Sequence, residues 1–302
     1  MKQILRRQDI SAILIAGPTA SGKSALALEM ARDLGGEIVN ADSMQVYSVL
    51  DRLTARPDQQ DLALAPHHLY GHVSPETAYS TGLWLDQATQ TIAGIRARGA
   101  LPVVVGGTGL YFRALTGGLS DMPVIPDPIR NELRARLESE GVEALHAELF
   151  RLDPDMGARL RPADRQRILR ALEVVVATGQ SITRFQGRGG VQIVDPRTAH
   201  CVVIEPDRAQ LHARINQRFE KMVEQGALDE VRKLMSLNVP PQHPGMKAIG
   251  VSQLADYLAG RQSLDQAVEL ASTATRQYAK RQMTWFRNQL DEQWERVHPK
   301  VG

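Results

Sequence analysis

Cysteine is nearly absent from the sequence, since Cys201 is the only one among 302 residues. A single thiol excludes an intramolecular disulfide and a cysteine-based zinc site, and this usage fits a protein of the reducing cytoplasm. Cys201 lies in the short apolar run 199–204, which is typical of a buried strand. A free cysteine in such a run behaves as a small hydrophobic residue. We therefore predict a structural rather than a catalytic cysteine.

Long hydrophobic runs are also missing. No apolar stretch reaches the roughly 18 residues that a membrane span requires, so we expect neither a membrane span nor a cleaved secretory signal. Aromatic residues make up only 5% of the chain, which predicts an aliphatic interior, and a net charge of +2 does not by itself identify a nucleic-acid partner. With 43% hydrophobic and 23% charged residues, the composition excludes disordered and collagen-like classes.

Short apolar runs alternate with helical patterns in the first third of the chain. Strand-like runs at 12–16, 37–40 and 101–105 enclose helical patterns at about 22–34 and 83–98. This alternation predicts an α/β fold with a parallel sheet covered by helices. In such folds, ligands bind beyond the carboxyl ends of the strands.

The pattern changes at about residue 119, where three prolines open a segment of Arg- and Glu-rich helical periodicity that three glycines close. Strand-like residues then return at 200–204. The length allows two domains of the usual size, roughly 100 to 200 residues each. We therefore predict a first part of the core at 1–118, an all-helical insertion at 119–193, and a core completion with C-terminal helices at 194–302.

One motif indicates phosphate chemistry. It matches G-x-x-x-x-G-K-[ST] in full and consists of Gly17, Pro18, Thr19, Ala20, Ser21, Gly22, Lys23 and Ser24. A strand-like run precedes it and a helical pattern follows, which is the context of a phosphate-binding loop. The glycines let backbone N–H groups turn toward a polyphosphate, Lys23 bridges phosphate oxygens, and Ser24 is a candidate ligand of Mg²⁺. These features predict a P-loop-type core that binds a diphosphate or triphosphate.

The acid that completes an ordinary ATPase is missing from its usual place. A Walker-B strand ends in a carboxylate that helps to hold Mg²⁺, whereas the run 101–105 is followed by Gly-Gly-Thr. The acid nearest to this pattern is Asp42, which follows the strand-like run 37–40. Two interpretations stay open from the residues alone. Asp42 is either a base that acts on an incoming nucleophile beside the phosphate loop, or an N-cap of segment 43–49.

Four segments together resemble one enzyme family. They are the phosphate loop, Ala-Asp-Ser-Met-Gln-Val-Tyr at 41–47, Val-Gly-Gly-Thr-Gly-Leu-Tyr-Phe at 105–112, and Gln-Arg-Phe at 217–219. In this order and spacing they resemble the tRNA dimethylallyltransferases, also called tRNA isopentenyltransferases, of the bacterial type without a zinc finger. The resemblance implies transfer of a dimethylallyl group from dimethylallyl diphosphate to N6 of adenosine 37 in the tRNA anticodon loop, with release of pyrophosphate.

The resemblance also implies roles for individual residues. The phosphate loop and Arg218 would bind the diphosphate and stabilise the leaving group, with Mg²⁺ as cofactor on Ser24. Asp42 would orient the amine of the adenosine and accept its proton, and Thr108 would hold the base. We expect a monomeric enzyme whose partners are dimethylallyl diphosphate and the tRNA anticodon stem-loop, with the target base unstacked before it reacts.

Local clusters of positive charge form a candidate RNA surface that the small net charge conceals. Arginines outnumber acids between residues 159 and 188, although such a run by itself often indicates only a solvated helix face. Near the C-terminus, Arg276, Lys280 and Arg287 form a basic stripe, and we interpret Trp285 opposite them as a packing residue. By the resemblance, tRNA contacts are predicted at Asp42, Ser43, Met44, Gln45, Thr108, Arg130, Gln166, Arg167, Ile168, Leu169, Arg170 and Lys247.

Two positions depart from the family pattern. The family commonly has Asp-Ile-Gly-Thr-Ala-Lys-Pro where this chain has residues 51–57, and Leu53 replaces the glycine. This substitution leaves open the shape of the loop and a phosphate or RNA contact through Arg56. Val251 stands where an aromatic residue is usual, which argues against base stacking at that position.

Two other classes of protein compete with this interpretation. A P-loop kinase of a small metabolite or nucleotide would use Asp42 to activate a hydroxyl, with the Arg-rich insertion as a lid over ATP. A non-catalytic RNA-binding switch would respond to the bound nucleotide without forming a product. Transfer of label from dimethylallyl diphosphate to an anticodon-loop RNA separates the first interpretation from both.

Overall fold

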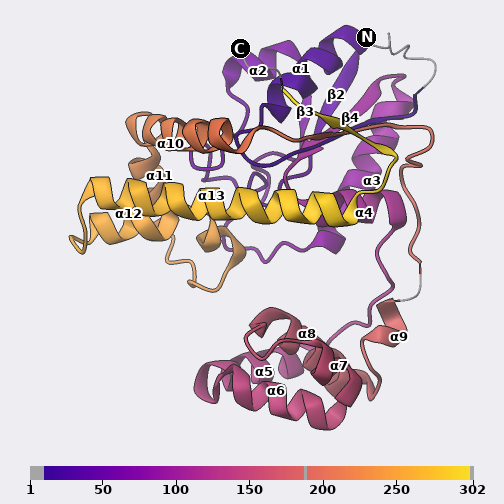
Figure 1. Cartoon of the computed structure of the whole chain (residues 1–302), viewed down its shortest axis with the longest axis vertical. Coiled ribbons are helices and arrows are strands. Elements are labelled where there is room, and N and C mark those ends of the chain that lie inside the picture. The colour runs from indigo at the N-terminus through magenta and orange to yellow at the C-terminus, as the bar shows by residue number, and fades with distance from the viewer. Residues whose placement is uncertain (1–9, 187–188, 300–302) are drawn as a thin grey trace. The chain divides into compact units, whose positions relative to one another are not determined.

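The computed structural model describes residues 10–186 and 189–299 (Figure 1). The chain divides into two compact units. The larger unit joins the N-terminal part, up to Thr116, with the part from Gln192 onward, and the smaller unit is Gly117–Val191. The smaller unit therefore begins and ends two residues before the predicted insertion 119–193.

A parallel sheet forms the centre of the larger unit. Its strands lie in the order β3-β2-β4-β1-β5-β6, and all neighbouring pairs are parallel. The predicted parallel sheet is confirmed, but the sequence did not indicate the two edge strands β3 and β6. The six strands are β1 (Ile13–Ala16), β2 (Gly36–Asn40), β3 (His67–His68), β4 (Leu101–Gly106), β5 (His200–Ile204) and β6 (Trp294–Val297).

Both faces of this sheet are buried. Ile13 and Ile15 of β1 pack on one face against α1, whereas Leu14 packs on the other face in the same cluster as Trp84 of α3. Because successive side chains of a strand point to opposite faces, a strand that is covered on both sides is apolar throughout. The helices of this part are α1 (Lys23–Leu34), α2 (Gln59–Leu64), α3 (Thr81–Ala97) and α4 (Gly109–Gly117).

The C-terminal helices share a second core with residues 46–53. Phe219, Val251 and Ala271 lie in this core together with Val46 and Leu53. The longest helix, α13, drawn in yellow in Figure 1, begins with a capping box between Ser263 and Gln266 and packs against α10 and α12. These elements are α10 (Arg208–Glu224), α11 (Ala227–Ser236), η2 (Pro244–Lys247), α12 (Val251–Leu258) and α13 (Leu264–Gln289).

The smaller unit is helical in its described part and has a core of its own. Leu145, Leu149, Ile168 and Leu172 are completely buried in it. Its helices are α5 (Asp127–Ser139), α6 (Gly141–Leu152), α7 (Pro154–Arg159), α8 (Arg165–Thr178) and α9 (Thr183–Gln186). In neither unit does a described helix combine the length and the apolar character that a membrane span needs.

The only cysteine lies where the sequence places it, in strand β5, with 2% of its surface exposed. Burial, helped by the negative charge of Asp291, raises the pKa of the Cys201 thiol to about 12. The thiol is therefore protonated at pH 8, and only the thiolate reacts with disulfide reagents. We predict no labelling of the native protein by such a reagent at pH 8 and one label per chain after denaturation, measured by mass spectrometry. Rapid labelling of the native protein would contradict the burial of this strand.

Candidate active site

Three loops meet at the carboxyl edge of the sheet. They follow β1, β2 and β4, which are neighbours in the strand order. Because parallel strands end at the same edge, the loops after them lie side by side. The phosphate-loop motif, Asp42 and Thr108, which are far apart in the sequence, therefore lie in one region.

The loop between β1 and α1 has the backbone shape that its glycines predict. Gly22 has a φ of 89°, and Ala20, which has a side chain, has a φ of 62°. A Cβ atom on Gly17 would lie 2.8 Å from Ser21 Oγ. This hydroxyl is buried and finds no hydrogen-bond partner among the described residues. The loop thus contains a polar atom that no described protein group satisfies.

Two cations and one carboxylate influence one another at this loop. The Lys23 ammonium donates a hydrogen bond to Pro18 O at 3.2 Å, and the Arg218 guanidinium of α10 donates one to Thr19 Oγ1. Burial lowers the pKa of Lys23 to about 8, an effect that Asp42 opposes and Arg218 reinforces. Burial also lowers the pKa of Arg218, which Asp42 counteracts, yet a guanidinium keeps its charge at neutral pH. Asp42 is therefore the negative charge shared by both cations.

Asp42 is held in a turn and does not cap a helix. Its Oδ1 accepts the N–H of Met44 at 3.0 Å, and its own N–H donates to Asn40 Oδ1 at 2.8 Å. Asn40 Nδ2 donates to the carbonyls of Asp42 and Leu69, each at 3.0 Å. Since residues 43–49 form turns and a single β-bridge instead of a helix, the N-cap interpretation of Asp42 is wrong.

Thr108 is joined directly to the Asp42 turn. Its Oγ1 accepts the N–H of Ser43 at 2.9 Å and lies 3.2 Å from Ser43 Oγ, to which it donates. The N–H of Thr108 donates to Ala41 O at 3.1 Å. The structure therefore brings together two residues that the sequence proposed for one site, the carboxylate after β2 and the threonine after β4.

The glycines around Thr108 are explained by close contacts. A Cβ atom on Gly106 would overlap the backbone of Ala41, and one on Gly109 would overlap the ring of Trp285. A Cβ atom on Gly107 would overlap the side-chain amide of Gln282 and lie 3.1 Å from Asp42 Oδ2. The Gly-Gly-Thr-Gly sequence is thus required by how closely other segments approach this loop, and Trp285 packs as interpreted from the sequence.

Sequence reasoning missed two residues that hold this region together. Gln282 of α13 accepts the N–H of Thr19 at 3.0 Å and donates to Gly107 O at 2.8 Å. Asn40 fixes the Asp42 turn, as described above. Neither belongs to a recognisable motif, since a glutamine within a helix and an asparagine at a strand end are common. For Gln282 the only available signal was its spacing of four residues from both Tyr278 and Phe286.

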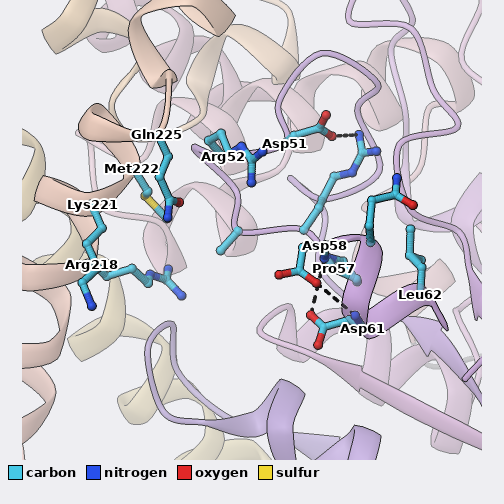
Figure 2. A pocket seen from close by; sticks show the side chains of 13 residues that line it. Asp51, Arg52, Pro57, Asp58, Asp61, Leu62, Arg218, Lys221, Met222 and Gln225 are labelled. Carbon is cyan, nitrogen blue, oxygen red and sulfur yellow. Dashed lines mark hydrogen bonds and ion pairs between the residues drawn. The ribbon is translucent and has the colours of Figure 1, made fainter. Parts of the chain in front are cut away.

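A cavity of about 360 Å³ adjoins Arg218. In Figure 2, Arg218 and Lys221 of α10 form one wall, and Arg52, Asp58 and Asp61 are among the residues opposite. The cavity therefore has both basic and acidic groups at its boundary. No cluster of three or more His, Cys, Asp or Glu residues suited to a metal ion occurs in the described ranges.

The structure shows how the chain accommodates the two departures from the family pattern. Leu53 is buried, and the carboxylate of Glu230 accepts its N–H at 3.1 Å. Arg56 pairs with Asp51 at 2.7 Å and donates to two backbone carbonyls, so its guanidinium is occupied within the loop. Val251 is 1% exposed and belongs to the C-terminal core.

Among the other predicted tRNA contacts of the larger unit, some side chains are exposed and others are hydrogen-bonded within the protein. The side-chain amide of Gln45 donates to the carbonyls of Thr54 and Ala55, at 2.9 and 2.8 Å, and so supports the loop that follows it. Lys247 is exposed at the end of η2, and Ser43 and Met44 are partly exposed. Arg276 of the C-terminal basic stripe is bound to Asn216 and Glu269 within the larger unit.

In the smaller unit, most of the predicted contacts lie at the surface and one does not. Gln166 and Arg167 are exposed on α8, and Leu169 is partly buried. Ile168 is completely buried in the helical core, on the face of α8 that packs, so its side chain does not form part of the exposed surface. Three of the predicted arginines form ion pairs, namely Arg170 with Glu173 at 3.1 Å, Arg130 with Asp127 at 3.3 Å and Arg167 with Asp164 at 3.5 Å. Arg188 of the predicted basic cluster lies outside the described residues.

Comparison with known proteins gives consistent matches over almost the whole chain. Residues 45–289 match the family model for IPP transferase, and residues 10–67 match that for isopentenyl transferase. A tRNA dimethylallyltransferase from Rhizobium leguminosarum bv. trifolii is 60% identical, covering 95% of this chain and 97% of its own length.

Solved structures agree with these sequence matches. The full-length tRNA isopentenylpyrophosphate transferase from Bacillus halodurans is similar with a TM-score of 0.68 and 35% identity, covering 95% of this chain and 89% of that one. A eukaryotic dimethylallyltransferase acting on tRNA gives a TM-score of 0.74 with 28% identity, over 91% of this chain and 69% of that one.

A phosphate loop combined with Asp42, in place of the usual Walker-B acid, defines a P-loop α/β protein other than an ordinary ATPase. The matches narrow this class to one family. The chain belongs to the tRNA dimethylallyltransferases, and the resemblance seen in its motifs is confirmed.

The close contact at Gly109 predicts the effect of adding a single methyl group. In Gly109→Ala the new methyl group overlaps the Trp285 ring, and forced overpacking typically costs about 1–3 kcal/mol. We expect the melting temperature to fall by several degrees and the tryptophan fluorescence to change.

Gly117→Ala, at the other end of α4, is the matched control because nothing lies within 4 Å of its added Cβ. Its melting temperature should stay the same or rise slightly. Equal effects of the two substitutions would contradict the packing of Trp285 on Gly109.

Proposed function

We propose that this chain transfers the dimethylallyl group of dimethylallyl diphosphate to N6 of adenosine 37 in the tRNA anticodon loop and releases pyrophosphate. The observation that carries the proposal is the position of Asp42. This carboxylate interacts with Lys23 of the phosphate loop and with Arg218 of α10, and it is connected through Ser43 to Thr108. The Asp42 carboxylate therefore lies between the proposed site of the anionic leaving group and the proposed site of the adenine.

The phosphate loop would bind the prenyl donor, dimethylallyl diphosphate. Backbone N–H groups of residues 17–24, the N-terminus of α1, Lys23 and Arg218 would bind the diphosphate. As the allylic C–O bond breaks, negative charge grows on the diphosphate oxygen, and these fixed donors stabilise it in the transition state. The unsatisfied Ser21 Oγ supports an additional polar partner in this loop.

The two carboxylate oxygens of Asp42 indicate how the acceptor adenosine would be activated. Oδ1 is occupied by the N–H of Met44, whereas no hydrogen bond of Oδ2 with the described residues is observed; Oδ2 lies next to Gly107. Oδ2 would accept a proton from the exocyclic amine of the adenine. The nitrogen of that amine would at the same time form the new bond to the allylic carbon. Thr108, which adjoins Asp42 through Ser43, would hold the adenine. The bond formed is N–C, the bond broken is C–O, and the proton goes to Asp42.

Magnesium fits this site by the chemistry of its ligands. Mg²⁺ usually binds through one or two protein oxygens together with substrate phosphates and water. Ser24 offers an exposed hydroxyl in the first turn of α1, beside the loop. Ser24 would therefore hold the ion against the diphosphate, where the ion would neutralise part of the phosphate charge.

The tRNA would be held by the remaining predicted residues. Gln166 and Arg167 present polar groups on the exposed face of α8, and Lys247 presents one on the larger unit. Most protein contacts to nucleic acids are made to phosphates and fix the position of the target, without reading its sequence. Arg130, Leu169, Arg170, Ser43, Met44 and Gln45 complete the proposed set.

Substitution of Asp42 tests the proposal directly. We expect wild-type protein to move label from dimethylallyl diphosphate to an unmodified anticodon stem-loop RNA, and Asp42→Asn to lose about 10²- to 10⁴-fold in rate because it lacks the base. RNA affinity, measured by fluorescence anisotropy, should stay within about threefold.

Asp86→Asn, on the exposed surface of α3, is the matched control and should keep wild-type activity. Unchanged turnover of Asp42→Asn would refute the role of Asp42. Consumption of ATP with no label on RNA would support the kinase interpretation, which the family relationship does not favour.

The lowered pKa of Lys23 predicts how pyrophosphate binding depends on pH. An ammonium with a pKa of about 8 loses its charge as the pH rises through that value, so the affinity for the anion should fall between pH 7 and pH 9.5. We expect calorimetry to show proton uptake on binding above pH 8, because the bound anion favours the charged lysine.

Lys23→Arg is the control, since a guanidinium stays charged over this range. The part of the pH dependence that Lys23 causes should disappear, which leaves only that of pyrophosphate itself. Identical pH profiles for wild type and Lys23→Arg would contradict the assignment.

A further inference from the structure

We propose that Gln282 is a positioning residue that fixes the phosphate loop relative to the Thr108 loop. This inference rests on the proposed function, because the two loops would hold the two reactants. Gln282 lies on α13, and only 5% of its surface is exposed. Its single side chain binds two loops that are 263 and 175 residues away in the sequence.

The two hydrogen bonds require a side chain that both accepts and donates. One partner, the N–H of Thr19, is a donor, and the other, the carbonyl of Gly107, is an acceptor. At this side-chain length, glutamine offers an acceptor and a donor on one planar group at every pH, whereas glutamate does so only when it is protonated. A glutamate would place a second acceptor against the Gly107 carbonyl, and a methionine would leave both backbone groups without a partner.

Each end of this bridge continues into a proposed catalytic group. Thr19 accepts a hydrogen bond from Arg218 through its side chain while Gln282 holds its backbone N–H. Gly107 directly precedes Thr108, and its missing side chain makes room for the Gln282 amide. The bridge thus runs from the guanidinium that would bind the diphosphate to the threonine that would hold the base.

Packing of α13 alone does not explain a buried amide here. Ala279 and Phe286, neighbours on the same helix, already supply apolar contacts in the core. A buried amide is favourable only when it is hydrogen-bonded. A long apolar side chain would serve helix docking equally well, whereas it could not align the two loops.

Loss of the bridge should affect the reaction step more than the binding of either substrate. Each substrate would bind mainly to its own loop, but reaction needs the allylic carbon and the amine to be aligned. A displacement of about 1 Å can reduce a rate by about 10²-fold. We expect Gln282→Met to lower kcat by about 10- to 100-fold, with both KM values within about threefold of wild type.

Gln277→Met is the matched control, with the same change at an exposed position of α13. Its kcat should equal that of wild type. Hydrogen exchange provides a readout that does not depend on catalysis. The N–H of Thr19 should exchange faster in Gln282→Met than in wild type, and at the wild-type rate in Gln277→Met. If wild type transfers no label, the proposed function fails, but this exchange measurement still decides whether the bridge exists.

Gln282→Glu provides the test if the methionine variant does not fold. A protonated carboxyl group has one acceptor and one donor, so it can restore both hydrogen bonds, whereas the carboxylate cannot. Burial and the negative charge of Asp42, which also lies beside Gly107, favour protonation, whereas the cations Arg218 and Lys23 at the phosphate loop favour the carboxylate. We expect the activity of Gln282→Glu relative to wild type at the same pH to rise as the pH is lowered.

The use of a ratio to wild type removes the pH dependence that both proteins share. The proposal is overturned if Gln282→Met keeps wild-type kcat, if its loss lies only in KM or melting temperature, or if the Gln282→Glu ratio is independent of pH.

Discussion

Arg218 lies close enough to lower the pKa of Lys23, and Asp42 is the negative charge that acts on both cations. Burial disfavours the charged form of each cation, so the loop holds positive charge at a cost in free energy. An anion bound at the loop would offset that cost. In the proposed function this anion would be the diphosphate, and Asp42 would act on the acceptor amine.

The surrounding fold serves to hold these charges in place. The parallel sheet brings the loops after β1, β2 and β4 to one edge, and Asn40 and Thr108 fix the turn that carries Asp42. Gly106 allows close contact between the loops after β2 and β4. Gln282 adds a connection from the C-terminal helix to both the phosphate loop and the Thr108 loop. Residues at opposite ends of the chain therefore determine one geometry.

Much of this arrangement could be predicted from the sequence because it is encoded locally. The phosphate loop, the continuous apolar strands and the buried Cys201 follow from neighbouring residues alone. What could not be predicted depends on distant partners. Strand β3 exists through pairing with β2 and is only two residues long, and the role of Gln282 depends on hydrogen bonds to residues far away in the sequence. Ile168 lies within the segment that the family resemblance assigns to tRNA binding, and it is a core residue because it lies on the packing face of α8.

The most direct test of the account is the position of the product bond. Unmodified tRNA would be incubated with the protein and dimethylallyl diphosphate, and the anticodon-loop nucleosides would then be analysed by mass spectrometry with fragmentation. The account predicts one dimethylallyl group on N6 of adenosine 37, next to the anticodon. An unmodified adenosine, or a dimethylallyl group on another atom or nucleotide, would contradict it.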